Sequence, residues 1–208
     1  MKMRHIADST VRRLSLYLRF LEEFEAQGVA TVSSAALAQR GGTTSAQVRK
    51  DLSFFGSFGK RGLGYAVPEL AQRLRDILGL HRPYEVVVIG AGKIGSALTH
   101  YRGFEARGFN IRWVFDRDPS KVGNSWNGIH IRDLSQLERD LTLRPPEIAI
   151  LAIPADGAQE VAERLLRLGV RAFLNFAPVQ LVVPDDVAVK NVNMALELEA
   201  LSYALRNR

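Results

Sequence analysis

The sequence contains no cysteine, which excludes disulfides, thiolate metal sites and catalysis by a cysteine nucleophile. Its four histidines, at positions 5, 81, 100 and 130, do not have the spacing of metal ligands, so we expect no bound metal. The sequence has no run of about 18 apolar residues, and its N-terminus lacks the apolar stretch of a secretory signal. We therefore expect a cytoplasmic protein that does not associate with a membrane.

The positive charge of the chain is concentrated in its first part. The 208 residues suffice for one large or two small domains, and the net charge is +6. Residues 1–80 carry 12 Lys and Arg against 7 Asp and Glu, whereas residues 81–208 carry 16 against 15. A basic part followed by a nearly neutral remainder is typical of a nucleic-acid-binding domain joined to another domain. A solvated basic face is the alternative explanation.

The first 54 residues predict three helices. The first is expected at 10–27, with Ser9 as its N-cap and Gly28 after its end. An apolar stripe follows its length at spacings of three and four, formed by Val11, Leu14, Leu18 and Leu21. A short second helix is expected at 34–40 and a third at 45–54, separated by a Gly-Gly break.

The third helix carries a polar, basic face. Thr44 and Gln47 have the spacing of a capping box, in which the threonine hydroxyl accepts a backbone N–H and the glutamine side chain reaches back. Val48, Leu52 and Phe55 are expected in the core. The DNA-contacting side chains on this helix are then Ser45, Gln47, Arg49, Lys50 and Ser53. This arrangement indicates a helix-turn-helix whose last helix enters the major groove, although basic helical hairpins also occur without DNA.

The segment after these helices predicts a wing. Residues 58–65 read FGKRGLGY, which favours a hairpin with a glycine-rich, basic tip. Lys60, Arg61 and Gly62 at that tip would contact the minor groove or the flanking phosphates. An ordinary surface hairpin is the alternative. A helix beginning at Pro68 follows, and the first domain is expected to end at residue 80.

A dinucleotide-binding pattern opens the second domain. Residues 85–89 form an apolar run typical of a buried parallel strand, and GAGKIG follows and opens a helix. In this pattern the first glycine makes a tight turn, the second lets the backbone approach a pyrophosphate, and the third allows the helix to pack on the strand. The predicted cofactor-binding residues here are Gly90, Ala91, Gly92, Lys93, Ile94 and Gly95.

The next strand indicates which dinucleotide is bound. It is expected at 111–115 and ends in Asp116, 21 residues after Gly95, where an acid can bind a ribose 2′-hydroxyl. A carboxylate there would repel a 2′-phosphate, which favours NAD over NADP, although Arg117 adds a cation beside it. The alternative is a strand-end aspartate that contacts no ligand.

The remaining residues predict further α/β units and a terminal helix. Strands are expected at 148–153, 173–176 and 187–192 and a helix at 157–168, which together indicate a Rossmann-type parallel sheet. The nicotinamide is expected near the strand ends, at Pro154, Asn175, Phe176, Ala177 and Pro178. An apolar-faced helix at 194–206 is expected to pack on another subunit.

Three segments, QVRKDLSFFGSFGKRGLGYAV, IGAGKIGSAL and LNFAPVQL, resemble the Rex family of bacterial redox-sensing transcriptional repressors. The resemblance covers nearly the whole chain. It implies an α/β homodimer with a winged helix-turn-helix domain at 1–80, a Rossmann domain for NADH or NAD⁺ at 81–192, and a dimerisation helix at 193–208 that is swapped onto the partner. It also implies repression through operator double-stranded DNA, from which NADH releases the protein.

The resemblance also implies a coupling cluster. The family's Arg–Tyr–Asp cluster between domains and subunits maps onto Arg19, Tyr101 and position 193. This sequence departs from the family there, because position 193 is Asn193 and not aspartate. An amide can hydrogen-bond to Arg19 but cannot form a charge pair with it.

Two other classes of protein share parts of this pattern. An NAD-dependent dehydrogenase needs a group that transfers a proton or polarises the substrate near the nicotinamide. No histidine or lysine lies directly after Pro154 or around residues 175–178, Asp156 is the nearest acid, and the chain has no substrate domain. A CoA- or nucleotide-binding module without DNA would leave the basic first part unexplained. We therefore predict a regulator that is not an enzyme.

Overall fold

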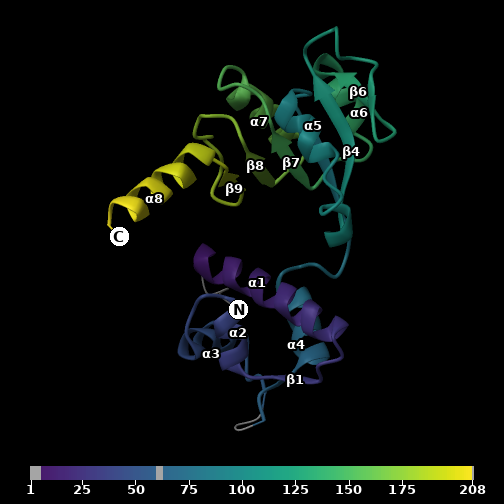
Figure 1. Ribbon diagram of the computed structural model, residues 1–208. Helices are drawn as coiled ribbons and strands as arrows, with labels where there is room; N and C mark the ends of the chain where they lie inside the picture. The colour runs from purple at the N-terminus through teal and green to yellow at the C-terminus, as the bar shows by residue number, and fades with distance from the viewer. Residues whose placement is uncertain (1–5, 60–62, 208) are drawn as a thin grey trace. The chain divides into compact units, whose positions relative to one another are not determined.

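The computed structural model describes residues 6–59 and 63–207 (Figure 1). The chain divides into two compact units, Met1–Arg82 and Pro83–Arg208. Within the described ranges, no helix is long and apolar enough to cross a membrane. The same residues contain no group of histidine and acidic side chains that could hold a metal ion.

The first unit is a small helical domain. Its elements are α1 (Asp8–Ala26), β1 (Thr31–Val32), α2 (Ser34–Arg40), α3 (Ser45–Ser53), β2 (Tyr65–Ala66) and α4 (Val67–Ile77). The three helices predicted for the first 54 residues are confirmed. The prediction of Ser9 as the N-cap of the first is wrong, because α1 starts at Asp8 and the Ala7 carbonyl accepts the N–H groups of Thr10 and Val11. The buried stripe of α1 includes Tyr17, whereas Val11 is exposed.

The strand β2 has a different partner from the one predicted. It pairs antiparallel with β1, Val32 opposite Tyr65, and residues 54–59 of the described chain form no strand. Gly59 nevertheless lies against Gly64 and Tyr65, since a Cβ on it would collide with the Gly64 carbonyl and the Tyr65 ring. The predicted tip at 60–62 lies outside the described residues, so the hairpin stays a prediction.

The second unit is an α/β sheet domain. Its strands are β3 (Tyr84–Ile89), β4 (Phe109–Asp116), β5 (Ser125–Trp126), β6 (Ile129–Asp133), β7 (Ile148–Leu151), β8 (Ala172–Asn175) and β9 (Ala188–Asn191). The helices are α5 (Lys93–Thr99), η1 (Glu105–Arg107), η2 (Leu134–Gln136), α6 (Leu137–Leu141), α7 (Ala158–Arg167) and α8 (Met194–Arg206).

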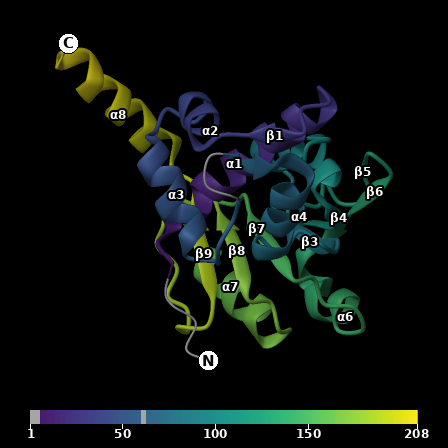
Figure 2. The ribbon, with the colours of Figure 1, turned by 90° about the horizontal axis from the view of Figure 1, so that it is seen from below.

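The order of these strands is that of a dinucleotide-binding sheet. They run β5-β6-β4-β3-β7-β8-β9, and of the described strands of this sheet only β5 is antiparallel to its neighbour (Figure 2). Without β5, this is the 3-2-1-4-5-6 order of the Rossmann fold, with β3 as the first strand. The order reverses between β3 and β7, which is the crevice where such sheets bind ligands.

The centre of the sheet is buried on both faces. Side chains on successive positions of a strand point to opposite faces. On β3, Val87 and Ile89 lie in one core with α6 and α7, while Val86 and Val88 lie in a second core on the other face. This explains the uninterrupted apolar run that predicted the strand.

An ion pair joins the two helices that cover the first face. Arg164 of α7 donates from Nε and Nη2 to the two carboxylate oxygens of Glu138 on α6, both at 2.6 Å, and Nη2 also donates to the Leu134 carbonyl at 2.9 Å. These hydrogen bonds lower the pKa of Glu138 to about 2. Because the folded pKa lies below its ordinary value of 4.5, the pair stabilises the fold above that pH and the contribution is lost as the pH falls toward 2.

We therefore expect Arg164→Gln to lower the thermal unfolding temperature near pH 7, and the difference from the unsubstituted protein to shrink as the pH falls from 4.5 toward 2. Circular dichroism melts across this pH range measure it. Arg167→Gln, at an exposed position of the same helix, is the control: the Arg167 charge contributes least to the low pKa of Glu138, so this variant should have a much smaller effect than Arg164→Gln. If Arg164→Gln lowers the unfolding temperature by the same amount at every pH, the ion pair with Glu138 is not the source of the stabilisation.

Candidate functional site

Helix α3 presents the basic face that the sequence predicted. Val48 and Leu52 are buried, and Arg49 and Lys50 are exposed. The Arg49 guanidinium donates from Nη1 to the Ser34 hydroxyl of α2 at 3.0 Å, so this cation is held beside the preceding helix. The Ser53 hydroxyl donates to the Lys50 carbonyl at 2.8 Å and is therefore used within the helix.

The capping box at the start of α3 is half formed. The Thr44 hydroxyl accepts the Gln47 N–H at 3.1 Å, as predicted. The Gln47 side chain does not reach back to Thr44, which corrects the second half of the prediction. Its Nε2 donates instead to Asp51, one turn further along, at 2.8 Å. A charged acceptor is a stronger partner than a neutral backbone group, which accounts for the difference.

Asp51 is fully buried on α3, and four hydrogen bonds surround its carboxylate. Arg13 of α1 donates from Nε to Oδ2 at 2.6 Å and from Nη2 to Oδ1 at 2.7 Å. The Tyr17 hydroxyl donates to Oδ2 at 3.0 Å, and Gln47 supplies the fourth bond. These four residues, Arg13, Tyr17, Gln47 and Asp51, are called the Asp51 network below.

The network keeps its carboxylate ionised. Burial raises the pKa of Asp51, but the hydrogen bonds from Arg13, Gln47 and Tyr17 outweigh it, so the pKa lies below its ordinary value. Burial, together with the bond to Asp51, raises the pKa of Tyr17 to about 12. At neutral pH the network therefore contains a carboxylate, a guanidinium and a neutral phenol.

The predicted wing residues Lys60, Arg61 and Gly62 lie outside the described residues. Their contact with DNA stays a prediction, as does that of Ser45 and the other side chains of α3.

The glycine loop lies at the carboxyl end of β3. A Cβ on Gly95 would collide with the Gly90 carbonyl, and one on Gly90 would collide with the Ala152 carbonyl after β7. Both positions therefore require glycine, as the pattern predicted. Gly92 is the N-cap of α5 and provides no side-chain cap, so the first N–H groups of the helix are left for an external acceptor.

Asp116 lies at the end of β4 and braces this loop. It is buried, its Oδ2 accepts the Ala91 N–H at 2.6 Å, and its Oδ1 accepts the Asp118 N–H at 2.8 Å. The adjacent cation is Lys121, whose Nζ lies 3.2 Å from Oδ2. Arg117, which the sequence pointed to, is exposed and pairs with Asp156 at 3.9 Å. Asp116 thus has a structural task besides any contact with a ribose.

The other predicted cofactor residues follow β7 and β8. The register aligns Ile89 with Leu151 and Leu151 with Asn175, so Pro154 and residues 175–178 lie at the same edge of the sheet as the glycine loop. Asn175 is buried and bonds with the Val179 carbonyl, the Asn191 side chain and the Ala177 N–H. This asparagine shapes the loop at Phe176 and Pro178, and direct contact with a cofactor stays a prediction.

The three predicted coupling residues have separate surroundings. Arg19 is exposed on α1 of the first unit. Tyr101 is 60% exposed, and its ring packs edge-on against Phe104 at 5.0 Å. Asn193 is the N-cap of α8, and its Oδ1 accepts the Ala195 N–H at 3.0 Å. The prediction that the three meet stays open.

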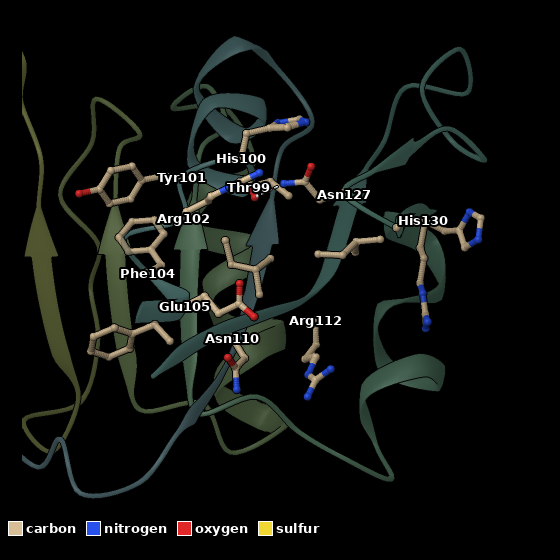
Figure 3. Close-up of a pocket in the computed structure, with 15 residues that line it drawn as sticks. Thr99, His100, Tyr101, Arg102, Phe104, Glu105, Asn110, Arg112, Asn127 and His130 are labelled. Atoms are coloured by element: carbon tan, nitrogen blue, oxygen red, sulfur yellow. Dashed lines mark hydrogen bonds between the residues drawn. The ribbon is translucent and has the colours of Figure 1, made fainter. Parts of the chain in front are cut away.

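A pocket of about 480 Å³ lies away from the glycine loop, between the end of α5 and the strands β4 and β6 (Figure 3). Tyr101, Arg112 and His130 are among its lining side chains, and Arg112 donates to Glu85 at 3.2 Å. None of the predicted cofactor-binding residues lines it. The pocket therefore gives no support to the cofactor assignment, which rests on the strand ends.

Sequence reasoning missed Lys121 and the Asp51 network. Lys121 belongs to the turn after β4, where no periodic pattern signals a side chain's direction. Arg13 and Tyr17 are four residues apart and so share one face of α1, which is the signal that could have indicated a common partner.

Family models match both parts of the chain. "Putative DNA-binding protein N-terminus" matches residues 5–53, and "CoA binding domain" matches residues 81–179. The curated "Redox-sensing transcriptional repressor Rex" of Carboxydothermus hydrogenoformans is 48% identical over 206 residues, covering 99% of both chains. That of Thermus thermophilus is 46% identical over 202 residues, covering 97% of this chain and 95% of its own.

Solved structures agree with these relatives. The crystal structure of RSP, a Rex-family repressor, is 38% identical with a TM-score of 0.90, covering 99% of this chain and 96% of its own. The structure of RSP with β-NAD⁺ and operator DNA is 40% identical with a TM-score of 0.92, covering 99% and 94%. The predictions of an N-terminal DNA-binding domain joined to a Rossmann-type sheet, and of a repressor and not a dehydrogenase, are thereby confirmed. The chain belongs to the Rex family of redox-sensing transcriptional repressors.

Proposed function

We propose that this chain is a DNA-binding repressor that senses the ratio of NADH to NAD⁺, and that NADH binding releases it from operator DNA. The observation that carries the proposal is the full-length similarity to RSP, whose structures were solved with β-NAD⁺ and operator DNA and with β-NADH. Operator DNA is in the cytoplasm of a bacterium, and we place the protein there.

The DNA-reading surface is assigned to α3 and the segment after it. Arg49 and Lys50 are exposed cations on one helix, and its leading end carries Ser45 and Gln47. Such a helix contacts base edges through its first turns and phosphates through its cations. Lys60, Arg61 and Gly62 are assigned to the flanking backbone or minor groove on the strength of their sequence alone.

The cofactor is assigned to the carboxyl edge of the sheet. The glycine loop, with its uncapped α5 N-terminus, suits a pyrophosphate. Asp116 suits the adenine-side ribose, because a carboxylate with two oxygens can accept a ribose hydroxyl in addition to its present bonds. Residues 154 and 175–178 suit the nicotinamide, since they follow the strands on the other side of the switch point.

The homodimer is assigned to α8. This helix, all of whose residues are described, buries none of its side chains, and it projects beyond β9 (Figure 1). Its apolar side chains are between 57% and 73% exposed: Met194, Leu196, Leu198, Leu201, Tyr203 and Leu205. A 13-residue helix has little stability without tertiary packing. We therefore assign a second subunit as the partner that buries the apolar side chains of α8. Exchange of α8 between subunits is part of this proposal.

The assignment of Asp116 predicts cofactor choice. We expect NADH to bind more tightly than NADPH, because a 2′-phosphate would meet the carboxylate, and we expect Asp116→Ala to narrow that gap. Isothermal titration with both cofactors measures it. Since Asp116 also braces the loop through Ala91, NADH itself should bind more weakly to the variant. Asp118→Ala, which leaves the Ala91 contact in place, is the control. Equal affinities for both cofactors in the unsubstituted protein would contradict the assignment.

The function itself is tested by operator release. A duplex selected from a randomised library by the protein is labelled, and binding is measured by fluorescence anisotropy while NADH is added. The proposal requires the affinity for the duplex to fall. If saturating NADH leaves it unchanged, the sensing function fails, and an assay for dehydrogenase activity becomes the next experiment.

A further inference from the structure

The Asp51 network joins the core of the first unit to its DNA-reading helix. A buried carboxylate costs several kcal/mol unless donors compensate for the lost water. Here two of the donating side chains, Arg13 and Tyr17, come from α1, and the third, Gln47, belongs to α3 itself. The Asp51 carboxylate is thus hydrogen-bonded both by α1 and by Gln47, which lies in the first turn of α3.

The network determines which way the Gln47 amide faces. A carboxylate can only accept hydrogen bonds, so the Nε2 group of Gln47, and not its Oε1, must be the side that faces Asp51. The opposite rotamer would bring two acceptors together inside a buried site. No described residue donates a hydrogen bond to Oε1. Gln47 is the third residue of α3, and its side chain is only partly buried. The amide therefore offers its carbonyl oxygen outward.

We infer that Asp51 is a specificity-determining residue that acts through Gln47, fixing its amide so that Oε1 accepts a hydrogen bond from the exocyclic amino group of one base in the major groove. The partner group is N6–H of adenine or N4–H of cytosine, the amino donors on that edge. The inference rests on the proposed function, in that α3 is taken to be the reading helix. Arg13 and Tyr17 position Asp51 and contact no DNA themselves.

The test removes the amino group from the DNA. Gln47→Ala first identifies the base pair at which discrimination is lost, using all single base-pair substitutions of the selected duplex. At that pair, adenine is replaced by purine or cytosine by 2-pyrimidinone, each of which lacks the amino group. The unsubstituted protein should lose about tenfold in affinity for this duplex, and Gln47→Ala should lose nothing further.

The role of Asp51 is tested with Asp51→Asn. Arg13 Nε and the Tyr17 hydroxyl both donate to Oδ2, so the carbonyl oxygen of the asparagine takes that place and its NH₂ group takes the place of Oδ1. The NH₂ group then faces Gln47, whose amide turns around, and Nη2 of Arg13 loses its acceptor. We expect the tenfold penalty for the missing amino group to fall below about twofold, while discrimination at other base pairs is kept. Tyr17→Phe is the matched control: it removes one donor to Asp51 but leaves the bond to Gln47, and should keep the full penalty.

The outcomes are separable. If the amino-deleted duplex binds the unsubstituted protein as well as the parent duplex, the inference is overturned. The inference is also overturned if Asp51→Asn lowers the affinity for every duplex by the same factor, because a residue with a purely structural role would give that result. Should Asp51→Asn not fold, as judged by circular dichroism, the amino-deletion comparison with Gln47→Ala still tests the contact through which Asp51 is inferred to act, and a negative result there overturns the inference. If neither Gln47→Ala nor Arg49→Ala affects any duplex, the assignment of α3 as the reading helix fails and this inference fails with it, whereas failure of the proposed function shows separately as a lack of operator release by NADH.

Discussion

Saturating NADH should release the protein from its operator, and operator DNA should in turn weaken NADH binding by the same factor. This reciprocity follows from linkage between two sites on one molecule. A shift from mostly bound to mostly released requires NADH to favour the DNA-incompetent arrangement of the proposed dimer by roughly 5 kcal/mol at most. NADH must prefer that arrangement, because equal affinity for both would shift nothing. Anisotropy titrations of the labelled operator with NADH, and of NADH with and without operator, measure both factors.

The same titrations test the coupling residues. NAD⁺ should act weakly or in the opposite direction, because its nicotinamide ring is charged. Asn193→Asp should change the ratio of the two cofactors' effects while leaving unliganded operator affinity nearly unchanged. The substitution is well matched, since aspartate caps a helix about as well as asparagine and α8 keeps its N-cap. Arg19→Ala and Tyr101→Phe should reduce the coupling factor. If all three variants leave the coupling factor between NADH and operator binding unchanged, these residues do not take part in the coupling.

Arg49→Ala should weaken operator binding by about 1–3 kcal/mol and relax base preference at one position, if its guanidinium reads a guanine. Arg61→Ala should weaken all duplexes alike and reduce the salt dependence, as expected for a phosphate contact. Binding is measured by anisotropy at several salt concentrations against the operator and an unrelated duplex. Arg73→Ala, an exposed arginine on α4, is the control and should change neither. An Arg49→Ala, Arg61→Ala double variant with undiminished binding would contradict the winged-helix assignment.

Local sequence patterns were sufficient to predict the elements whose apolar residues recur with a regular period. Val48 and Leu52 of α3 lie in the core because their spacing matches the helical period, and β3 with its glycine loop was found because strand, turn and helix follow one another directly. The strand β6 and the helix α6 were missed. The strand includes a histidine, an arginine and an aspartate among its five residues, and α6 is too short to show a period.

The site was predictable in kind but not in detail. A carboxylate is expected at the surface of a folded protein, so no local sequence pattern indicated that Asp51 would be buried. It is buried because Arg13 and Tyr17, more than thirty residues earlier, supply its donors. Likewise the position of Asp116 predicted a cofactor contact, whereas its bonds to Ala91 and Lys121 depend on how the loops fold over the strand ends.

The buried carboxylate also limits how this domain could evolve. If Gln47 contacts a base as inferred, any replacement that alters this contact also takes a hydrogen bond away from a charge that water cannot reach, so a new operator preference would carry a loss of stability. Descendants could escape that loss only by changing Asp51 together with Arg13. We would therefore expect lineages that keep this aspartate to keep the same base at the corresponding operator position, and lineages that lose it to drift there.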